Sequence, residues 1–387
     1  MIFYVIVMTT VLTHIAFKGS KVLIALYAME LGANPFSVGM LFSLYSLFPL
    51  FLAVYAGRLS DRLGPRVPML IGAGGLGCGL LLPYLLPGLP ILYVSATLIG
   101  TCYIFYTIAV QHLIGTFSAG HDRTRNFSTF SLGIGVTALL GPAVSGFSID
   151  LIGHQPTYLL LALLPVGPVL FLLFFSGQLP RAAVAARQEE QRAMDLVRNA
   201  PLRRALVTAG IVETAFELFN FYMPIYGHSI GLSASLIGIV MGTFAIALLL
   251  MRAVMPMLVR KSSEELVLCG SLGLAAATCV LFPFVTNVHL LLAISFVLGL
   301  GLGCCPPLSM IITYNRAPAG RSGEAMGLRQ TVNKFTEVMV PLIFGTLGAA
   351  FGLGPAFWMD ALLLAAGAFL MRTDARLRVR TRRATSG

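Results

Sequence analysis

Charged residues are scarce in this chain. Only 11% of its 387 residues are charged, whereas 57% are hydrophobic, and the mean hydropathy is +0.87. A soluble globular domain carries about 25% charged residues, so this chain has too few polar side chains to cover a water-facing exterior. The many Phe residues within apolar runs exclude a disordered chain. The composition therefore predicts a membrane protein with several spanning segments.

Several functional motifs are also missing. No Gly-x-x-x-x-Gly-Lys-Ser/Thr loop occurs, which argues against ATP-driven pumping. The net charge of +11 comes without a recognition motif or a basic stripe interleaved with aromatic residues, so no nucleic-acid partner is expected. No basic region precedes Lys18, and we predict no cleaved signal peptide.

The six cysteines lack the paired spacing of a disulfide or metal framework and are expected to be small core residues. We therefore expect no metal and no cofactor. They are Cys78, Cys102, Cys269, Cys279, Cys304 and Cys305.

Twelve apolar runs approach the length of about 20 residues that a transmembrane helix needs. Polar residues or Pro and Gly separate them. The predicted spans are 2–31, 36–57, 67–86, 91–115, 127–152, 156–177, 204–230, 234–258, 265–285, 289–313, 325–350 and 355–372.

The loops between these spans alternate in charge. Basic residues gather in one set, which comprises 57–66, 119–125, 178–203, 259–265, 315–324 and the C-terminal tail. The other set, which includes 87–90 and 352–355, has no Lys or Arg. Because basic loops stay in the cytoplasm, the pattern places the first set and both termini inside the cell.

The chain also matches itself at an offset of 199 residues that does not drift. The matched positions are mostly Gly and Pro, where backbone geometry or close helix approach matters. The pairs are Tyr27 with Tyr226, Gly32 with Gly231, Gly39 with Gly238, Gly74 with Gly273, Gly100 with Gly299, Pro142 with Pro341, Gly146 with Gly345, and Gly153 with Gly352. The repeat predicts two parallel halves of six helices, a plan found in alternating-access carriers.

Two local motifs resemble the major facilitator superfamily. The segment 57–66, Gly-Arg-Leu-Ser-Asp-Arg-Leu-Gly-Pro-Arg, is similar to the family's Gly-x-x-x-Asp-Arg-x-Gly-Arg-Arg loop signature and departs from it at Pro65. The segment 141–146, Gly-Pro-Ala-Val-Ser-Gly, is similar to the Gly-Pro-x-x-Gly-Gly element of the family's drug/proton antiporters, with Ser145 in place of one Gly. Gly-Pro also simply bends and thins a packed helix.

The resemblance covers nearly the whole chain and implies an all-α membrane fold. It comprises twelve transmembrane helices in two pseudo-symmetric six-helix bundles, with both termini cytoplasmic. The expected domains are a bundle over 1–177, a linker over 178–203, a bundle over 204–372 and a basic tail over 373–387. The tail is expected to meet anionic lipid headgroups of the bilayer.

The loop signature supplies a candidate gate. We expect Asp61, just beyond the second span, to accept bonds from basic neighbours or from amides at a helix end, which would favour one closed packing of the halves. The alternative is a solvated turn. The candidate gating residues are Gly57, Asp61, Arg62, Gly64 and Arg66, and the candidate helix-bend residues are Gly141, Pro142 and Gly146. Arg260 stands at the position of Asp61 in the second half, so any gate of this kind is asymmetric.

Ionisable residues inside the predicted spans are the candidate transport residues. A charged side chain at the centre of a helix costs about 2.5–3.5 kcal/mol on insertion scales, so it usually faces protein or water. Three triplets are spaced i, i+4, i+7 and thus share one helical face. They are His14, Lys18 and Lys21 in span one, their 199-offset partners Glu213, Glu217 and Asn220 in span seven, and Gln330, Lys334 and Glu337 in span eleven.

A first span that ended near Phe17 would leave Lys18 and Lys21 in a loop. In that case 22–31 would be too short to span, and the repeat aligns Lys18 with Glu217 inside a span. We therefore place both lysines within the first span. The family resemblance implies that spans one and seven line the central cavity with these faces toward each other.

Two interpretations of the charges remain open. In one, Lys18 or Lys334 forms buried structural ion pairs with the glutamates, which fix packing at little net gain. In the other, a carboxylate such as Glu217 exchanges protons and Lys18 meets an anionic substrate group, because a changing partner alters which charge state is favoured. We favour the second for Lys18 and Glu217; His14 is a possible proton relay but is more often a hydrogen-bonded wall residue.

Other polar residues are expected to be less informative. Tyr103 could line the cavity, although aromatic residues in spans usually pack. Arg252 is explained equally well by snorkelling to the interface. Glu30, Asp150 and Asp360 lie near the outer ends of spans and are expected to be solvated.

These patterns predict a secondary active transporter that is coupled to protons and moves a small anionic or zwitterionic solute by alternating access. Such a solute would be an organic acid, an amino-acid-like compound or a sugar-derived compound. The alternative is a drug/proton antiporter; a membrane-embedded enzyme or receptor is remote, and we expect no enzymatic activity. We expect a monomer, multi-pass in the inner (cytoplasmic) membrane, with the solute and H⁺ as partners.

Overall fold

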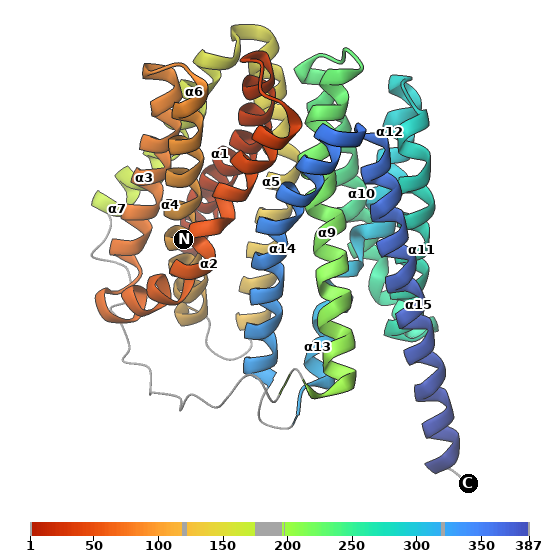
Figure 1. Ribbon diagram of the computed structural model, residues 1–387. Coiled ribbons are helices and arrows are strands. Elements are labelled where there is room, and N and C mark those ends of the chain that lie inside the picture. The colour runs from red at the N-terminus through yellow and green to blue at the C-terminus, as the bar shows by residue number, and fades with distance from the viewer. Residues whose placement is uncertain (1, 118–121, 175–195, 197, 319–321, 386–387) are drawn as a thin grey trace. The chain divides into compact units, whose positions relative to one another are not determined.

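The structure is a computed structural model, and its described residues are 2–117, 122–174, 196, 198–318 and 322–385. Over these residues the ordered elements are helices, and no strand occurs (Figure 1). This follows from the composition, because a helix satisfies its backbone hydrogen bonds internally where lipid offers no partner.

The helices follow the order of the twelve predicted spans. The first half contains α1 (Ile2–Glu30), α2 (Pro35–Leu63), α3 (Arg66–Leu85), α4 (Leu89–Phe117), α5 (Asp122–Ile152), α6 (His154–Leu163) and α7 (Val166–Phe174). The second contains α9 (Ala200–Ser229), α10 (Ala234–Lys261), α11 (Glu264–Leu281), the 3-10 turn η2 (Phe282–Phe284), α12 (Val288–Gly303), α13 (Cys305–Arg316), α14 (Ser322–Phe351) and α15 (Gly354–Thr385).

Two predicted spans are divided. The sixth span breaks between α6 and α7 at Pro165, and the tenth breaks at Cys304, two residues before Pro306 and Pro307. Proline lacks the backbone N–H that a continuous helix needs and clashes with the preceding turn. The apolar pattern alone did not reveal these breaks.

Some predicted boundaries were wrong. α2 continues past residue 57 to Leu63, and α15 continues past residue 372 to Thr385, although the parts apolar enough to span end at Ala53 and Arg376. Hydropathy reports the length that matches the bilayer, whereas the helical hydrogen bonds continue into polar sequence.

Local geometry repeats at the same offset as the sequence. Gly32 and Gly231 have φ of 83° and 80°, and Gly153 and Gly352 have φ of 85° and 82°. This left-handed backbone is strained for other residues, which explains glycine at all four turns. Gly100 approaches the backbone of Tyr45, and Gly299 that of Phe244, which is the same contact shifted by 199 residues.

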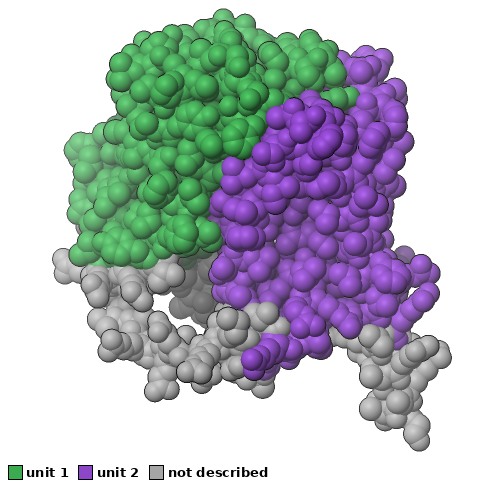
Figure 2. Space-filling model, viewed as in Figure 1, with its two compact units in different colours: residues 1–188, 223–242 green, residues 189–222, 243–387 purple. Residues whose placement is uncertain are grey.

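The chain forms two compact units, coloured separately in Figure 2. Unit 1 comprises 1–188 and 223–242, and unit 2 comprises 189–222 and 243–387. The predicted linker 178–203 lies largely outside the described residues. The two-bundle boundaries predicted from sequence remain a prediction.

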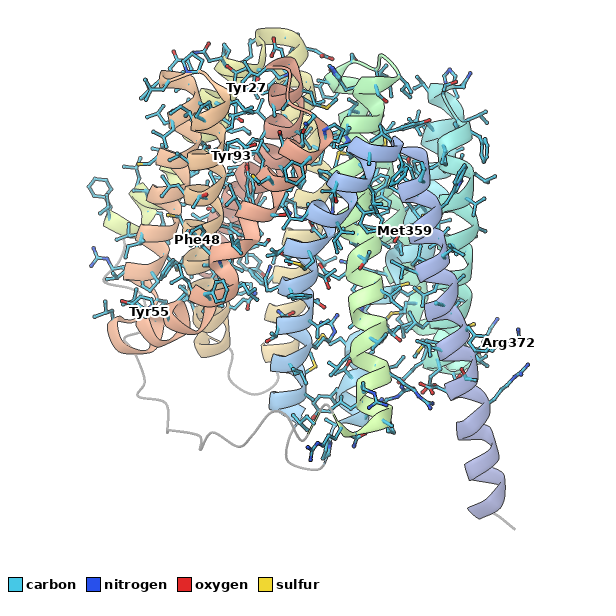
Figure 3. All side chains as sticks on the ribbon, in the orientation of Figure 1. Tyr27, Phe48, Tyr55, Tyr93, Met359 and Arg372 are labelled. Carbon is cyan, nitrogen blue, oxygen red and sulfur yellow. The ribbon has the colours of Figure 1, made fainter. Side chains whose placement is uncertain are left out.

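Large apolar side chains are exposed on both units, as expected of surfaces that face lipid. Phe48, Tyr55 and Met359 are among them and are labelled in Figure 3. Eleven of the described helical segments are long and apolar enough to cross a membrane. α9 is less apolar, since it carries Glu213, Glu217 and Asn220.

Candidate functional site

In unit 1, the predicted basic face lies on the continuous helix α1, so the lysines are not in a loop. His14 is 2% exposed, and its Nδ1 is 2.9 Å from the Thr10 carbonyl oxygen. A carbonyl only accepts hydrogen bonds, so Nδ1 carries the proton in this contact and a neutral ring would leave Nε2 as an acceptor. The imidazole also meets the edge of Tyr103 at 5.1 Å between centroids.

An aromatic wall accompanies this basic face. Phe17 stacks on Tyr103 with ring centroids 3.5 Å apart, and it meets Tyr45 edge-on at 5.7 Å. The Lys21 ammonium lies 5.9 Å from the centre of Phe17 and 5.7 Å from that of Phe42. Cation–π contact and the apolar rings hold Lys21 against a surface suited to flat or ring-bearing groups.

The Gly-Pro element of α5 packs directly against the lysine-bearing turn of α1. A methyl group on Gly141 would lie 2.7 Å from Cβ of Lys18, and Ser145 Oγ donates to the Gly19 carbonyl at 2.8 Å. Small residues are therefore required here for the backbones to approach. The Gly-Pro element therefore positions Lys18 through close packing, in addition to any bend that Pro142 introduces in α5.

The C-terminal end of α5 holds the first turn of α10, all within unit 1. The Asp150 carboxylate accepts hydrogen bonds from the Ala234 amide at 3.1 Å and the Ser235 amide at 2.8 Å. A methyl group on Gly146 would be 3.3 Å from Cα of Ser235. Asp150 is exposed, as expected, but it also satisfies a helix N-terminus.

In unit 2, the predicted acidic face lies on α9. Glu217 is 7% exposed. The Asn220 amide donates one N–H to the Phe216 carbonyl of its own helix at 2.9 Å, which leaves its oxygen and its second N–H for a partner.

The third triplet, on α14, lies in the same unit. Lys334 Nζ donates to both oxygens of Glu337, at 2.5 and 2.7 Å, so its hydrogen bonds go to its own helix. The Glu213 carboxyl group interacts electrostatically with Glu337 and Glu217 and with Lys334. Gln330 is exposed.

Sequence analysis missed two buried polar residues of α14. Arg329 is 8% exposed within the helix and acts electrostatically on Glu213. Its Nη2 donates to the Pro306 carbonyl at 3.4 Å, and its Nε has no hydrogen-bond partner among the described atoms. Asn333, one turn later, is 9% exposed. The signal was available, because residue 329 lies inside the predicted span 325–350.

The candidate gate is described only in part. Gly57 and Asp61 lie inside α2, and Gly64 ends that helix with φ of 76°, which explains the glycine of the signature. The side chains of Asp61 and Arg62 lie outside the described residues, and Arg66 is exposed at the start of α3. The gate therefore stays a prediction.

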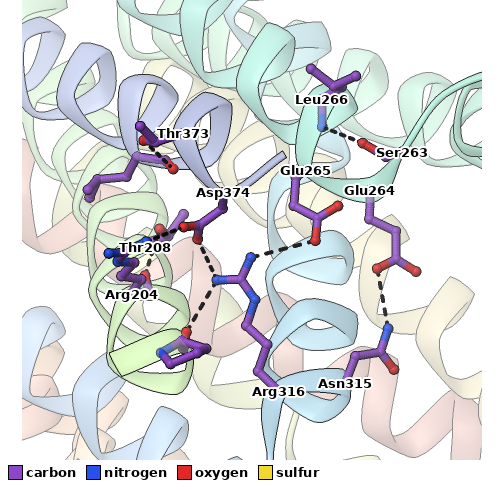
Figure 4. A network of polar contacts seen from close by, with 12 residues as sticks. Arg204, Thr208, Ser263, Glu264, Glu265, Leu266, Asn315, Arg316, Thr373 and Asp374 are labelled. Atoms are coloured by element: carbon purple, nitrogen blue, oxygen red, sulfur yellow. Dashed lines mark hydrogen bonds and ion pairs between the residues drawn. The ribbon is translucent and has the colours of Figure 1, made fainter. Parts of the chain in front are cut away.

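An ion-pair network in unit 2 was not predicted (Figure 4). Arg316 Nη1 donates to Asp374 Oδ2 at 2.7 Å, Arg204 Nη1 donates to Asp374 Oδ1 at 2.7 Å, and Arg316 Nη2 is 3.5 Å from Glu265 Oε1. Arg316 and Asp374 thus connect four helices, α9, α11, α13 and α15. Their sequence separation hid the network.

The expectation for Asp360 was wrong. Its side chain is 1% exposed rather than solvated, and Oδ2 accepts a hydrogen bond from Cys279 Sγ at 3.6 Å. Position near the end of a span does not decide exposure when a neighbouring helix covers the residue. Glu30 is indeed exposed and lies 2.6 Å from His154 Nδ1.

The cysteines are unbonded to one another. Four are buried, as expected of core residues, whereas Cys78 is exposed and Cys269 is half-buried. No group of three or more His, Cys, Asp or Glu residues in the described ranges could hold a metal ion.

Comparison with known proteins gives consistent results. The profile of the Major Facilitator Superfamily matches residues 6–335 and 205–386. The multidrug resistance protein MdtG of Proteus mirabilis is 25% identical over 373 residues, covering 93% of this chain and 92% of that protein. The tetracycline resistance protein, class H, of Pasteurella multocida is 24% identical over 345 residues, covering 86% and 83%.

Solved structures share the fold. The nucleoside transporter NupG has a TM-score of 0.77 at 15% identity, covering 95% of this chain and 98% of that chain. A POT family transporter in complex with a thioalcohol conjugated peptide has a TM-score of 0.80 at 15% identity, covering 96% and 95%. With the helical fold, the repeat and the profile match in agreement, the chain belongs to the major facilitator superfamily and is a multi-pass inner-membrane transporter of a small solute.

Proposed function

We propose that this transporter couples solute movement to protons and takes a small organic solute with an anionic or zwitterionic part. The supporting observation is a cluster of ionisable groups on α9 and α14 of unit 2. Lys334 donates to both oxygens of Glu337, and Glu213 and Glu217 lie within electrostatic range of Lys334. A carboxylate in an apolar bundle can take up or release a proton when a nearby cation changes partner.

The basic face of α1 supplies the substrate side of this proposal. Lys18 and Lys21 offer positive charge, and Phe17, Tyr45 and Tyr103 offer rings beside it. Such a surface favours an organic anion with an apolar or ring-bearing body. In this proposal Glu217 is a proton-binding carboxylate and Lys18 is the substrate contact.

Multidrug efflux is the second candidate. The names of the MdtG and tetracycline-resistance relatives favour it, as does the Gly141-Pro142 element. A cation in α1, where a drug exporter would use a carboxylate for cationic drugs, favours anionic or zwitterionic compounds within that class. We also propose that both termini are cytoplasmic, from the loop charges, and that the protein acts as a monomer.

Proteoliposome transport tests the proposal. The parent protein is compared with Lys18→Ala and Glu217→Gln, with Glu30→Gln as a control for an exposed acid. Uptake of labelled solutes and of drug-like dyes is followed with and without a pH gradient. We expect a gradient to drive transport by the parent and the control, and both site variants to fall to the level of protein-free liposomes.

Exchange of internal for external solute separates the two roles. Glu217→Gln should still exchange solute, since exchange needs no net proton movement, whereas Lys18→Ala should not. Gradient-driven transport at parental level in Glu217→Gln would contradict its role, and so would transport by the parent that ignores the gradient.

A further inference from the structure

Asp360 is an acid in an otherwise apolar stretch of α15. It is the single ionisable residue between Gly354 and Met371, and this part of α15 belongs to a segment apolar enough to span the membrane. It lies six residues from the start of the helix, or about 9 Å along the axis. A charged Asp at the centre of a span costs about 2.5–3.5 kcal/mol, so an acid in such a segment calls for an explanation.

The carboxyl group lies buried between α11 and α15, which pack side by side (Figure 1). Asp360 is 1% exposed and Cys279 is 2% exposed. One turn away, Phe357 of α15 stacks on Phe282 with ring centroids 5.0 Å apart. The edge of Tyr222 closes on Phe357 at 5.7 Å, while the Tyr222 hydroxyl donates to the Phe344 carbonyl.

No cation compensates the carboxyl group in the described part of the chain. Oδ2 accepts from the Cys279 thiol, and Oδ1 has no hydrogen-bond partner. The acids of α11, Glu264 and Glu265, begin the helix, about 21 Å along the axis from Cys279. A buried carboxylate without a cation is strongly disfavoured and takes up a proton instead.

The internal repeat shows that this architecture does not require an acid here. At the 199 offset, Asp360 corresponds to Leu161 and Cys279 to Leu80, and both leucines are fully buried. α3 and α6, which carry these leucines, pack together in the first half as α11 and α15 do in the second. Burying an acid and a thiol costs more free energy than burying two leucines at the corresponding positions. Packing alone therefore does not explain the acid, which points to a use for it.

We propose that Asp360 is a proton-binding site in the membrane, separate from the carboxylates of the candidate transport site, and that its proton exchanges with water. The neutral acid accepts the weak thiol hydrogen bond on Oδ2 and carries the proton on Oδ1, the oxygen without a partner. Cys279 is a positioning residue for this acid. The inference does not rest on the proposed function, because it concerns the resting protein without substrate.

Infrared difference spectroscopy of the purified full-length protein in lipid tests the proposal. Spectra of the parent and Asp360→Asn are recorded at pH 7, and Asp360→Leu, which copies the first-half residue, serves if the amide variant does not fold. We expect both variants to lose one carbonyl band of a protonated carboxyl group. Loss of carboxylate bands instead would overturn the proposal.

Two further measurements address exchange and positioning. Transfer of the parent to D₂O should shift the Asp360 band, and a band that stays unshifted would mean a sealed, structural proton and would overturn the proposal. Cys279→Ala should keep the band but move its frequency, since the thiol no longer donates. Cys269→Ala is the matched control and should leave the band unchanged; an equal response in both would contradict the positioning role.

Discussion

The first half has Leu80 and Leu161 at the positions where the second half has Cys279 and Asp360. A second contrast lies deeper in the bundles. In the first half the Tyr45 hydroxyl donates to Ser20 Oγ at 3.1 Å, whereas the equivalent residues Phe244 and Phe219 stack at 4.1 Å between centroids. Each time the helix contact is kept while its chemistry changes.

The backbone features of the halves do not differ in this way. The turn glycines share their positive φ, and Gly100 and Gly299 approach equivalent backbones. The comparison teaches that the small residues and turn glycines shared by the two halves specify the fold. The side chains that differ between the halves determine where each half carries charge. The basic α1 face and acidic α9 face, at the same offset, are the clearest example.

Moving the acid into the first half should have the largest effect. Leu161→Asp buries an acid in the half where Leu80 stands in place of the Cys279 thiol. We expect this variant to lower the free energy of unfolding by about 4 kcal/mol, because apolar burial is lost and a buried polar group is left unpaired. Denaturant unfolding in detergent measures this. Asp360→Leu should cost little or stabilise; equal losses in the two variants would contradict the asymmetry.

The shared backbone contacts should respond alike in both halves. Gly100→Ala and Gly299→Ala each place a methyl group within 2.7 Å of a neighbouring helix, at Cα of Tyr45 and Cβ of Ala247. We expect each to lower the free energy of unfolding by about 2 kcal/mol through overpacking.

Gly74 and Gly273 provide the matched control pair at the same offset. A methyl group on either meets nothing within 4 Å. Their alanine variants should be stabilised by up to about 1 kcal/mol, because alanine favours the helix. A destabilised control, or a loss in only one half of the test pair, would show that the halves are not equivalent at these contacts.

The smallest effect should follow from making the first half resemble the second. Tyr45→Phe removes one buried hydrogen bond, but Ser20 Oγ still donates to the Phe17 carbonyl at 2.8 Å. We therefore expect the free energy of unfolding, measured by denaturant unfolding in detergent, to fall by about 1 kcal/mol or less. Phe244→Tyr is the reverse change, and it should cost more, since Phe219 offers its hydroxyl no partner.

Much of this architecture was predictable from the sequence, because the length of each apolar run depends on local composition. The spacing of His14, Lys18 and Lys21 likewise placed them on one face of α1. Helix breaks at Pro165 and Cys304 were not predicted, because a broken helix remains apolar throughout.

The predictions that were wrong or missing concern residues whose surroundings depend on contacts between helices distant in sequence. Asp360 is buried by α11, which no feature of α15 discloses. Arg329 was not recognised as a candidate, although it is buried within α14 and donates to the Pro306 carbonyl of α13. Lys334 could have bonded to several glutamates, and only the structure selects Glu337.

The start of α10 has a practical consequence for dividing the protein. Residues 223–242 belong to the second repeat by sequence but to unit 1 by packing, with Asp150 bonded to the first amides of α10. Fragments 1–188 and 189–387 expressed from separate genes would therefore carry a docking contact between them. A break in the chain between residues 188 and 189 would leave this contact in place.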